Sequence, residues 1–423
     1  MRNDLKIYDR KKTVESNVWQ RVSCLYFPFP TEEVHEGSID LTIPKLALFA
    51  RGTTEYIPSK APVFYNPLMM LNRDVAVLAL KAYQKRVDRP LRICDPLTGC
   101  GVRGLRFASE VSGIDLVILN DLNLHAVRLA QLNSQKNGLT QNVFVENIDA
   151  RTLLGIYASR KKFDAIDVDP YGSPSPFIDS ALVALRNDGL LAVTATDVAP
   201  LCGVNPKACI RKYFGKPLRT EYCHELALRI LISCVILTAA KHDLGVTVLF
   251  SHSTDHYLRT YVQVKRGAKR ANNTLANVGY VLHCFNCLNR KWIGSLMPFL
   301  SRTCENCNDE MAIAGPLWLG KIADKEFCRD MCEEMGNTTL GTGKRLSRLL
   351  TTILEEIDAP PTYFVLDKIC KKLGVPATSR RKVVQKIGEM GYQAVRTHFN
   401  PNGIKSDASI RVIEEAIKAH QIH

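Results

Sequence analysis

The chain has 423 residues, of which 46% are hydrophobic and 23% are charged, and its formal net charge is +14. These proportions are ordinary for a globular protein of two or three domains, and they exclude a fibrous or low-complexity chain. The positive excess indicates a polyanionic partner such as nucleic acid, although a basic surface can also serve solubility. No run approaches the length that spans a bilayer, and the charged segment Met1–Lys12 lacks a signal-peptide pattern, so we expect no membrane and a cytoplasmic location.

The first predicted elements are a short strand over residues 37–44 and an apolar helix over residues 75–83. The sequence Asn66-Pro67 predicts a turn between them, and Asp74 could cap the helix. Arg73 stands at the entrance of this helix. It is either a solvated charge or a ligand for an anion, and its position alone favours the solvated reading.

A glycine-rich turn follows the first buried strand, predicted over residues 91–94. Asp95 opens the turn, Gly99 and Gly101 lie within it, and a helix is predicted over residues 105–110. A strand, a glycine turn and a helix let the backbone approach a ligand closely at a helix N-terminus. The acidic residue before the glycines departs from the dinucleotide fingerprint G-x-G-x-x-G.

Asp121 follows the second predicted strand, residues 115–120, where a carboxylate can bind both ribose hydroxyls of a nucleoside. Together, Asp95 and Asp121 fit S-adenosylmethionine at least as well as NAD. Asp149-Ala150 follows the third strand, residues 143–146. Asp149 could accept a hydrogen bond from an adenine amino group, or it could cap the helix predicted over residues 151–159.

The alternation of strands and helices continues to residue 265. Further strands are predicted over residues 163–168, 189–195, 246–251 and 258–265, and further helices over residues 124–137 and 221–241. The last two strands should pair antiparallel at the edge of the sheet. Seven strands with interleaved helices predict an α/β fold with a doubly wound, Rossmann-like sheet.

The sequence Asp169-Pro170-Tyr171-Gly172-Ser173-Pro174 lies directly after the strand over residues 163–168. Two prolines and a glycine forbid regular continuation, so these side chains lie at the carboxyl end of a strand, where open α/β sheets bind ligands. The Asp169 carboxylate and the Pro170 carbonyl can accept hydrogen bonds from an exocyclic amine, while Tyr171 stacks on the base. The alternative is a rigid turn whose Asp169 caps the helix that starts near Pro176.

Beyond residue 267 the character of the chain changes, and we expect one domain over residues 1–267 and a second over residues 268–423. Residues 265–270 read as a basic linker. Cys284, Cys287, Cys304 and Cys307 have the spacing C-x2-C-x16-C-x2-C, which is typical of a structural zinc site with four thiolates. The other ten cysteines are scattered and read as small core residues.

The last part of the chain, residues 321–423, is predicted to be rich in helices, over residues 345–357, 366–373 and 379–390, followed by a strand over residues 393–396. This pattern resembles a winged helix. Residues 361–423 contain eleven Lys/Arg and five Asp/Glu, a net charge of +6. Arg380, Arg381 and Lys382 stand at a predicted helix N-terminus, where they could bind phosphate, or they could form a solvated face.

These motifs together resemble the tRNA guanine-N2,N2-dimethyltransferase family over nearly the whole chain. The matching segments are residues 63–67, 72–74, 98–104, 120–121, 149–150 and 169–174, the four cysteines, and residues 396–399. The resemblance implies methylation of N2 of guanine 26 in tRNA with S-adenosylmethionine. It implies cofactor contacts from Arg73, Arg103, Asp121, Asp149 and Ala150, and catalysis by Asp169. Tyr171 stands where phenylalanine is frequent, which keeps the stacking face.

The implied reaction has a simple chemical basis. Guanine N2 is a poor nucleophile, and hydrogen bonds accepted by Asp169 and Pro170 would raise its electron density and orient it for attack on the methyl group. Two other classes stay open. An adenine-N6 methyltransferase could use the same box, and a non-catalytic, zinc-dependent RNA-binding protein could keep a degenerate core. We expect a monomer.

Overall fold

The computed structural model describes residues 27–51, 55–56, 60–299 and 301–419, so the charged segment 1–12 lies outside the described residues. The described chain opens with an antiparallel hairpin, β1 (Thr31–Glu36) and β2 (Ile39–Pro44), which confirms the predicted first strand. Gly37, at φ 62°, forms the turn of this hairpin. A second short pair follows, β3 (Ala50–Arg51) with β4 (Glu55–Tyr56).

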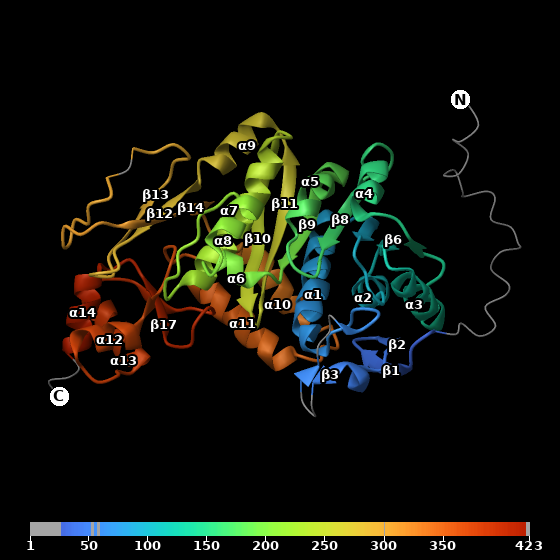
Figure 1. Cartoon of the computed structure of the whole chain (residues 1–423), viewed down its shortest axis with the longest axis horizontal. Helices are drawn as coiled ribbons and strands as arrows, with labels where there is room; N and C mark the ends of the chain where they lie inside the picture. Colours follow the sequence, from blue (N-terminus) through green and yellow to red (C-terminus); the bar gives the residue numbers. More distant parts are fainter. Residues whose placement is uncertain (1–26, 52–54, 57–59, 300, 420–423) are drawn as a thin grey trace, which may run out of the picture.

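The centre of the molecule is a seven-stranded sheet in the order β10-β11-β9-β8-β5-β6-β7 (Figure 1). Its strands are β5 (Leu91–Asp95), β6 (Ile114–Asn120), β7 (Val143–Glu146), β8 (Phe163–Val168), β9 (Leu185–Ala195), β10 (Leu244–Thr254) and β11 (Tyr257–Arg266). Strands β5 to β9 are mutually parallel, β11 is antiparallel to β9, and β10 pairs antiparallel with β11 at the edge. The predicted sheet and its antiparallel edge are therefore confirmed.

Helices cover both faces of this sheet. One face packs on α4 (Ala150–Ala158), α5 (Ser175–Ala184) and α8 (Cys223–Ala240), and the other on α1 (Met70–Val87), α2 (Val102–Glu110) and α3 (Leu124–Lys136). Neighbouring strand residues alternate between the two cores, since Ile93 belongs to one and Cys94 to the other. The short helices α6 (Val198–Leu201) and α7 (Pro206–Tyr213) connect β9 to α8.

Helix α8 corrects the expectation that no run approaches membrane-spanning length. Its 18 residues are long and apolar enough by composition, but 78% of them are buried inside the protein. Leu226, Leu231 and Val235 are completely buried in the core between the sheet and its neighbouring elements. The apolar character of α8 is therefore explained by its place in the core.

Helix α1 also begins earlier than the sequence indicates. Asp74 lies inside the helix, where its carboxylate accepts hydrogen bonds from the backbone N–H and hydroxyl of Thr342 at 2.9 and 2.6 Å. Asp74 is therefore not a helix cap. These bonds link α1 to Thr342, which belongs to the last third of the sequence.

The basic segment 265–270 is not a linker, contrary to the sequence interpretation. Lys265 and Arg266 end β11, and α9 (Ala268–Leu275) follows after Gly267 and packs on β10. A three-stranded sheet comes next, β13-β12-β14, formed by β12 (Val278–His283), β13 (Arg290–Ile293) and β14 (Ala312–Trp318). Val281 and Leu317 from this sheet belong to the same core as α8, so packing crosses the expected domain boundary, whose place stays a prediction.

The remaining elements are α10 (Lys325–Met335), α11 (Gly343–Glu356), β15 (Phe364–Val365), α12 (Leu366–Leu373), α13 (Arg380–Glu389), β16 (Ala394–Arg396), β17 (Gly403–Ser406) and α14 (Ile410–Lys418). Helices α10 and α11 pack on α1, in the core that α1, α2 and α3 form with one face of the central sheet. The elements from β15 onward have a core of their own at one end of the molecule (Figure 1). Their strand order, β15-β17-β16, is that of a winged helix.

Candidate active site

The segment 169–174 lies at the carboxyl end of β8, in the middle of the sheet. Pro174 is the N-cap of α5 and makes no side-chain capping bond, so Asp169 does not cap this helix. Tyr171 is 74% exposed, and its ring centroid lies 6.1 Å from that of Phe64. An acidic group and two accessible aromatic rings therefore stand together where the parallel strands end.

Arginine side chains hold the acidic group in place. Asp169 is 18% exposed, and its Oδ2 accepts from Arg103, whose Nη2 also donates to Asn72 Oδ1 at 2.7 Å. Burial alone would raise the pKa of Asp169, but the positive charges of Arg103 and Arg259 outweigh it and place the pKa below its usual range. Asp169 is therefore a carboxylate at neutral pH and acts as a hydrogen-bond acceptor.

Two further carboxyl groups lie beneath Asp169. Arg259, from β11, forms a fully buried ion pair with Asp167, and Asp167 also lies 3.7 Å from Arg103. Asp95 is 2% exposed and accepts from the Thr98 hydroxyl at 2.9 Å. Burial, and then the negative charge of Asp167, raise the pKa of Asp95 to about 7. The floor of the site thus holds three carboxyl groups and two guanidinium groups.

The glycine turn after β5 lies against Asp121. Gly99 and Gly101 have φ of +58° and +89°, which an L side chain rarely adopts, and Gly101 is the N-cap of α2. The Gly99 N–H donates to Asp121 Oδ2, and the Asn123 N–H donates to Asp121 Oδ1, each at 2.9 Å. The carboxylate is therefore fixed beside the turn, and each oxygen keeps a further lone pair for a ligand.

Asn120, just before Asp121, connects the ends of three strands. Its side-chain amide donates to the Pro96 and Ile148 carbonyls at 3.0 Å, and its oxygen accepts from the Ile148 N–H at 3.1 Å. A completely buried amide with these bonds sets the spacing of the turns after β5, β6 and β7.

Asp149 caps α4, as one of the two sequence interpretations expected. Its Oδ1 accepts from the backbone N–H groups of Arg151 and Thr152 at 3.0 and 3.2 Å. The Arg151 side chain, and then the Thr152 N–H, hold the pKa of Asp149 below its usual range. The carboxylate is 38% exposed and Ala150 is buried at the start of α4, so the cap does not exclude ligand contacts, and these stay a prediction.

Arg73 is not solvated, contrary to the reading that its position favoured. It is 4% exposed and forms a bidentate pair with the buried Glu36, at 2.5 and 2.6 Å. Glu36 also accepts from Arg106 at 3.1 Å and from the Tyr65 hydroxyl at 3.0 Å. Arg73 therefore fixes the β1–β2 hairpin to α1, and its cofactor contact stays a prediction.

Sequence reasoning did not assign Glu36, Arg259 or Asn72 to this region. All three are buried polar or charged side chains whose partners are remote in the chain. Arg259 offered one signal, because an arginine within an apolar strand requires a buried acidic partner. Asn72 stood beside Arg73 in a motif, but only the fold reveals its bond to Arg103.

The four cysteines meet, as their spacing predicts. The Sγ atoms of Cys284 and Cys307 lie 3.4 Å apart, those of Cys287 and Cys304 lie 3.5 Å apart, and all four lie within 4.8 Å of one another. A tetrahedral zinc ion with Zn–S bonds of about 2.3 Å requires sulfur separations of about 3.8 Å. The donor set and its size therefore fit a zinc ion.

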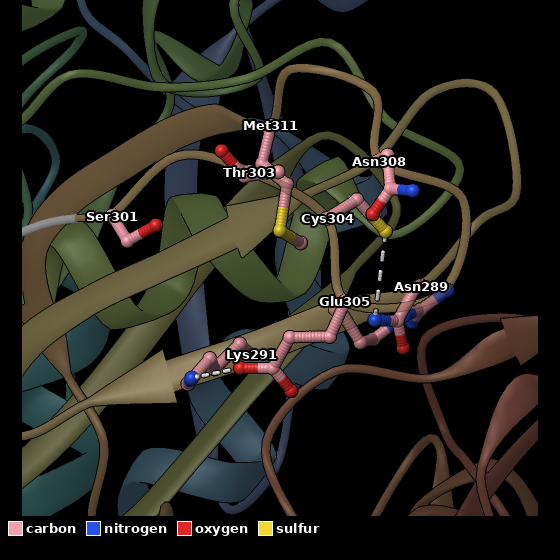
Figure 2. A pocket seen from close by; sticks show the side chains of 9 residues that line it. Asn289, Lys291, Ser301, Thr303, Cys304, Glu305, Asn308 and Met311 are labelled. Carbon is pink, nitrogen blue, oxygen red and sulfur yellow. Dashed lines mark hydrogen bonds and ion pairs between the residues drawn. The ribbon is translucent and has the colours of Figure 1, made fainter.

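A hollow of about 400 Å³ borders this cluster (Figure 2). It is lined by polar groups, among them Lys291, whose Nζ lies 2.5 Å from Glu305, and Asn289, which donates to Cys304 Sγ at 3.8 Å. Because it lies outside the group of carboxylates at the centre of the sheet, we do not assign the hollow to catalysis. Among the ten other cysteines, Cys24 lies outside the described residues, seven are buried, and Cys223 and Cys332 are half-buried.

The basic cluster of the last module lies at the start of α13, as predicted. Arg381 and Lys382 are exposed, whereas Arg380 is half-buried and donates to the Pro401 carbonyl. In the order α11, β15, α12, α13, β16, β17, this helix has the place of the third helix of a winged helix. Contact of these residues with RNA stays a prediction.

Residues 40–418 match the model of the family described as N2,N2-dimethylguanosine tRNA methyltransferase. The tRNA (guanine(26)-N(2))-dimethyltransferase of Methanothermobacter thermautotrophicus is 41% identical, over 91% of this chain and 98% of that protein. The tRNA (guanine(26)-N(2)/guanine(27)-N(2))-dimethyltransferase of Aquifex aeolicus is 34% identical, over 92% and 95% of the two chains. The solved structure of Trm1 from Pyrococcus horikoshii with S-adenosyl-L-methionine is similar at a TM-score of 0.79 and 33% identity, over 91% of this chain and 99% of that chain.

Proposed function

The chain belongs to the N2,N2-dimethylguanosine tRNA methyltransferase family, and from this membership we propose that it methylates the exocyclic N2 of guanine 26 in tRNA. S-adenosylmethionine supplies the methyl group, and the products are N2-methyl- and N2,N2-dimethylguanosine. The observation that carries this proposal is the position of Asp169-Pro170-Tyr171 at the end of β8, beside the glycine turn and Asp121.

The residues present fit S-adenosylmethionine. Asn72 Nδ2, Arg103 Nη1 and Asp167 Oδ1 are buried and have no hydrogen-bond partner among the described residues, so polar groups of a ligand can satisfy them. We propose that Asn72 and Arg103 bind the carboxylate of the methionine portion, and that the acidic floor formed with Asp95 attracts its ammonium group. Asp121 would hold the ribose hydroxyls, while Asp149 and the backbone at Ala150 would contact the adenine. Gly99 and Gly101 would permit close approach of the backbone, and Arg73 would support the site from α1.

Asp169 and Pro170 would orient the target amine. Arg103 occupies Asp169 Oδ2, so Oδ1 can accept one N2–H of guanine while the Pro170 carbonyl accepts the other. Exposed Tyr171 would stack on the base, which must leave its place in the tRNA at a cost of a few kcal/mol. The nitrogen becomes strongly acidic as the new bond forms, so the weakly basic Asp169 carboxylate suffices to take the proton.

The same arrangement serves a second transfer. N2-methylguanosine keeps one N2–H, and a single acceptor, Asp169 or Pro170, can still orient it. We propose a structural zinc ion at the four cysteines, because four thiolates leave no open coordination position. We also propose that Arg380, Arg381 and Lys382 contact tRNA phosphates, and that the enzyme is a cytoplasmic monomer with no membrane contact.

The test is incubation of the protein with unmodified tRNA and labelled S-adenosylmethionine, followed by nucleoside analysis by mass. The expected products are N2-methyl- and N2,N2-dimethylguanosine. Formation of N6-methyladenosine would instead identify an adenine-N6 enzyme. Cofactor binding without any methylated nucleoside would contradict the proposed activity.

A further inference from the structure

The α6–α7 segment, residues 198–220, carries a concentration of positive charge beside the active site. It contains Lys207, Arg211, Lys212, Lys216 and Arg219 and no acidic residue. The segment therefore has a net charge of +5 over 23 residues, which is more than a third of the net charge of +14 of the whole chain. The sequence pattern thus points to a surface that meets a polyanion.

Four of these five cations are available to a partner. Lys212 is bound to Asp197 at 3.0 Å, whereas Lys207, Arg211, Lys216 and Arg219 are exposed. Within the part of the chain that the structure describes, the side chains of these four make no ion pair or hydrogen bond. Their charges are therefore not neutralised within the protein.

Hydrogen bonds join the loop after Asp169-Pro170-Tyr171 to Thr196, just before the segment, and to Lys212 within it. The Gly172 N–H donates to Thr196 Oγ1 at 2.7 Å, and the Thr196 N–H donates to the Gly172 carbonyl at 3.0 Å. The Ser175 hydroxyl donates to the Lys212 carbonyl at 2.6 Å. The segment therefore lies close to the loop that carries Tyr171, at the edge of the sheet where β8 and β9 end.

The exposed residues of α7 form a stripe of mixed character. Lys207, Ile210 and Arg211 have the spacing i, i+3, i+4 that places them on one face of α7, while Cys209 and Tyr213 are buried on the other, and Phe214 follows as the C-cap residue. Ile210 is 47% exposed and Phe214 is 61% exposed. A basic and apolar stripe of this kind suits a nucleic acid whose bases are partly unstacked.

Phe214 also has a conformation that its own packing does not require. Its φ is +58°, in the left-handed region that bulky residues rarely adopt, and most of its side chain is in solvent. An asparagine or glycine would fit this position better, which indicates a use for the aromatic ring outside the folded chain.

We propose that the α6–α7 segment is a tRNA-binding surface, in which Lys207, Arg211, Lys216 and Arg219 bind the phosphates that flank the target guanine. Phe214 stacks on a tRNA base beside the target guanine. That base loses its stacking partner when the target guanine leaves the RNA helix. This inference rests on the proposed function, since it assigns tRNA as the occupant. It adds a binding surface next to Tyr171 to the one proposed for α13.

The first test measures tRNA binding as a function of salt for the full-length protein and the double variant Lys207→Ala/Arg211→Ala. Because two phosphates are then no longer bound by a cation, the slope of log binding constant against log salt should become shallower by about 1.4–1.8. A matched control is Lys325→Ala/Arg329→Ala on α10. Helix α10 contacts Arg86 near the end of α1. Arg73, near the start of α1, is 13 residues from Arg86, so the two residues lie about 20 Å apart along the helix. The control removes the same charge and should leave the slope unchanged.

The second test is Phe214→Asn, which keeps or raises thermal stability because asparagine tolerates the left-handed conformation. Loss of one stacked base should weaken tRNA binding by between about 5- and 150-fold. S-adenosylmethionine affinity should stay unchanged in all of these variants.

The outcomes separate this inference from the proposed function. If the unmodified protein forms no N2-methylguanosine, the proposed function fails, and this inference fails with it. If the protein is active but the double variant matches its control and Phe214→Asn binds tRNA normally, the inference alone is overturned. A loss of S-adenosylmethionine affinity in the same variants would also overturn it, because the segment would then support the cofactor site.

Discussion

Replacing Asp121 with alanine should selectively weaken binding of S-adenosylmethionine. The carboxylate is held by the Gly99 and Asn123 N–H groups at 2.9 Å, and its remaining lone pairs are those that the two ribose hydroxyls would use. Each hydrogen bond to a charged group contributes about 1.5–3 kcal/mol. Loss of one bond therefore weakens binding about 10-fold or more, and loss of both about 100-fold or more.

Calorimetry on a short series of variants would measure this effect. Asp121→Asn keeps one acceptor oxygen and should fall between the wild type and Asp121→Ala. Asp115→Ala is the matched control, because Asp115 lies near the start of β6, whose end precedes Asp121, and is 51% exposed. Among the described residues its one ion-pair partner is Arg92, at 3.9 Å. A folded Asp121→Ala protein that binds S-adenosylmethionine within twofold of the control would refute the ribose role.

The site and its surroundings lead to four further predictions. Asp169→Ala should abolish methyl transfer while S-adenosylmethionine affinity stays within a few-fold, and near-normal turnover would show that Asp169 is not catalytic. Protein purified without chelator should contain one zinc ion per chain, and Cys304→Ser should lose both the ion and thermal stability, whereas a zinc-free native protein would exclude the metal site. Changing Arg380, Arg381 and Lys382 to alanine should lower the salt slope of tRNA binding by about 0.7–0.9 for each phosphate that these side chains bind, and an unchanged slope would identify a solvated face. Glu356 is fully buried against His398 and Lys405; burial would raise its pKa, but the charges of these partners lower it to about 2. Because the folded pKa lies below the unfolded value of 4.5, the stability from Glu356 is complete above pH 4.5 and is lost as the pH falls toward 2. The difference in unfolding free energy between wild type and Glu356→Gln should narrow by about 2 kcal/mol from pH 6 to pH 3, and a constant difference would contradict this role.

The central sheet could be predicted because its signals are local. The strands predicted over residues 91–94 and 163–168 are short segments with mostly apolar residues, each followed by an aspartate and a proline, and β5 and β8 occupy them. The acidic residues that follow them could be placed at one edge for the same reason. The four cysteines were equally predictable, since a metal site has a fixed ligand spacing.

The interpretations that were wrong depended on the packing of remote residues. A run of basic residues at 265–270 reads as a linker, but Lys265 pairs with Asp188 at 2.9 Å and α9 packs on β10. Arg73 reads as a surface charge until Glu36, 37 positions earlier, is brought against it. Ion pairs between distant segments leave no periodic signal in the sequence, so only the fold reveals them.

The identity of the methylated nucleotide tests the central claim most directly. Two tRNA transcripts that differ only by guanine or adenine at position 26 would be incubated with the protein and labelled S-adenosylmethionine, then digested and mapped by mass. We expect N2-methyl- and N2,N2-dimethylguanosine at position 26 of the first transcript and no methylation at that position of the second. Methylation of adenine 26, or the absence of any methylated guanine in the first transcript, would contradict the assignment of Asp169-Pro170-Tyr171 as a site for guanine N2.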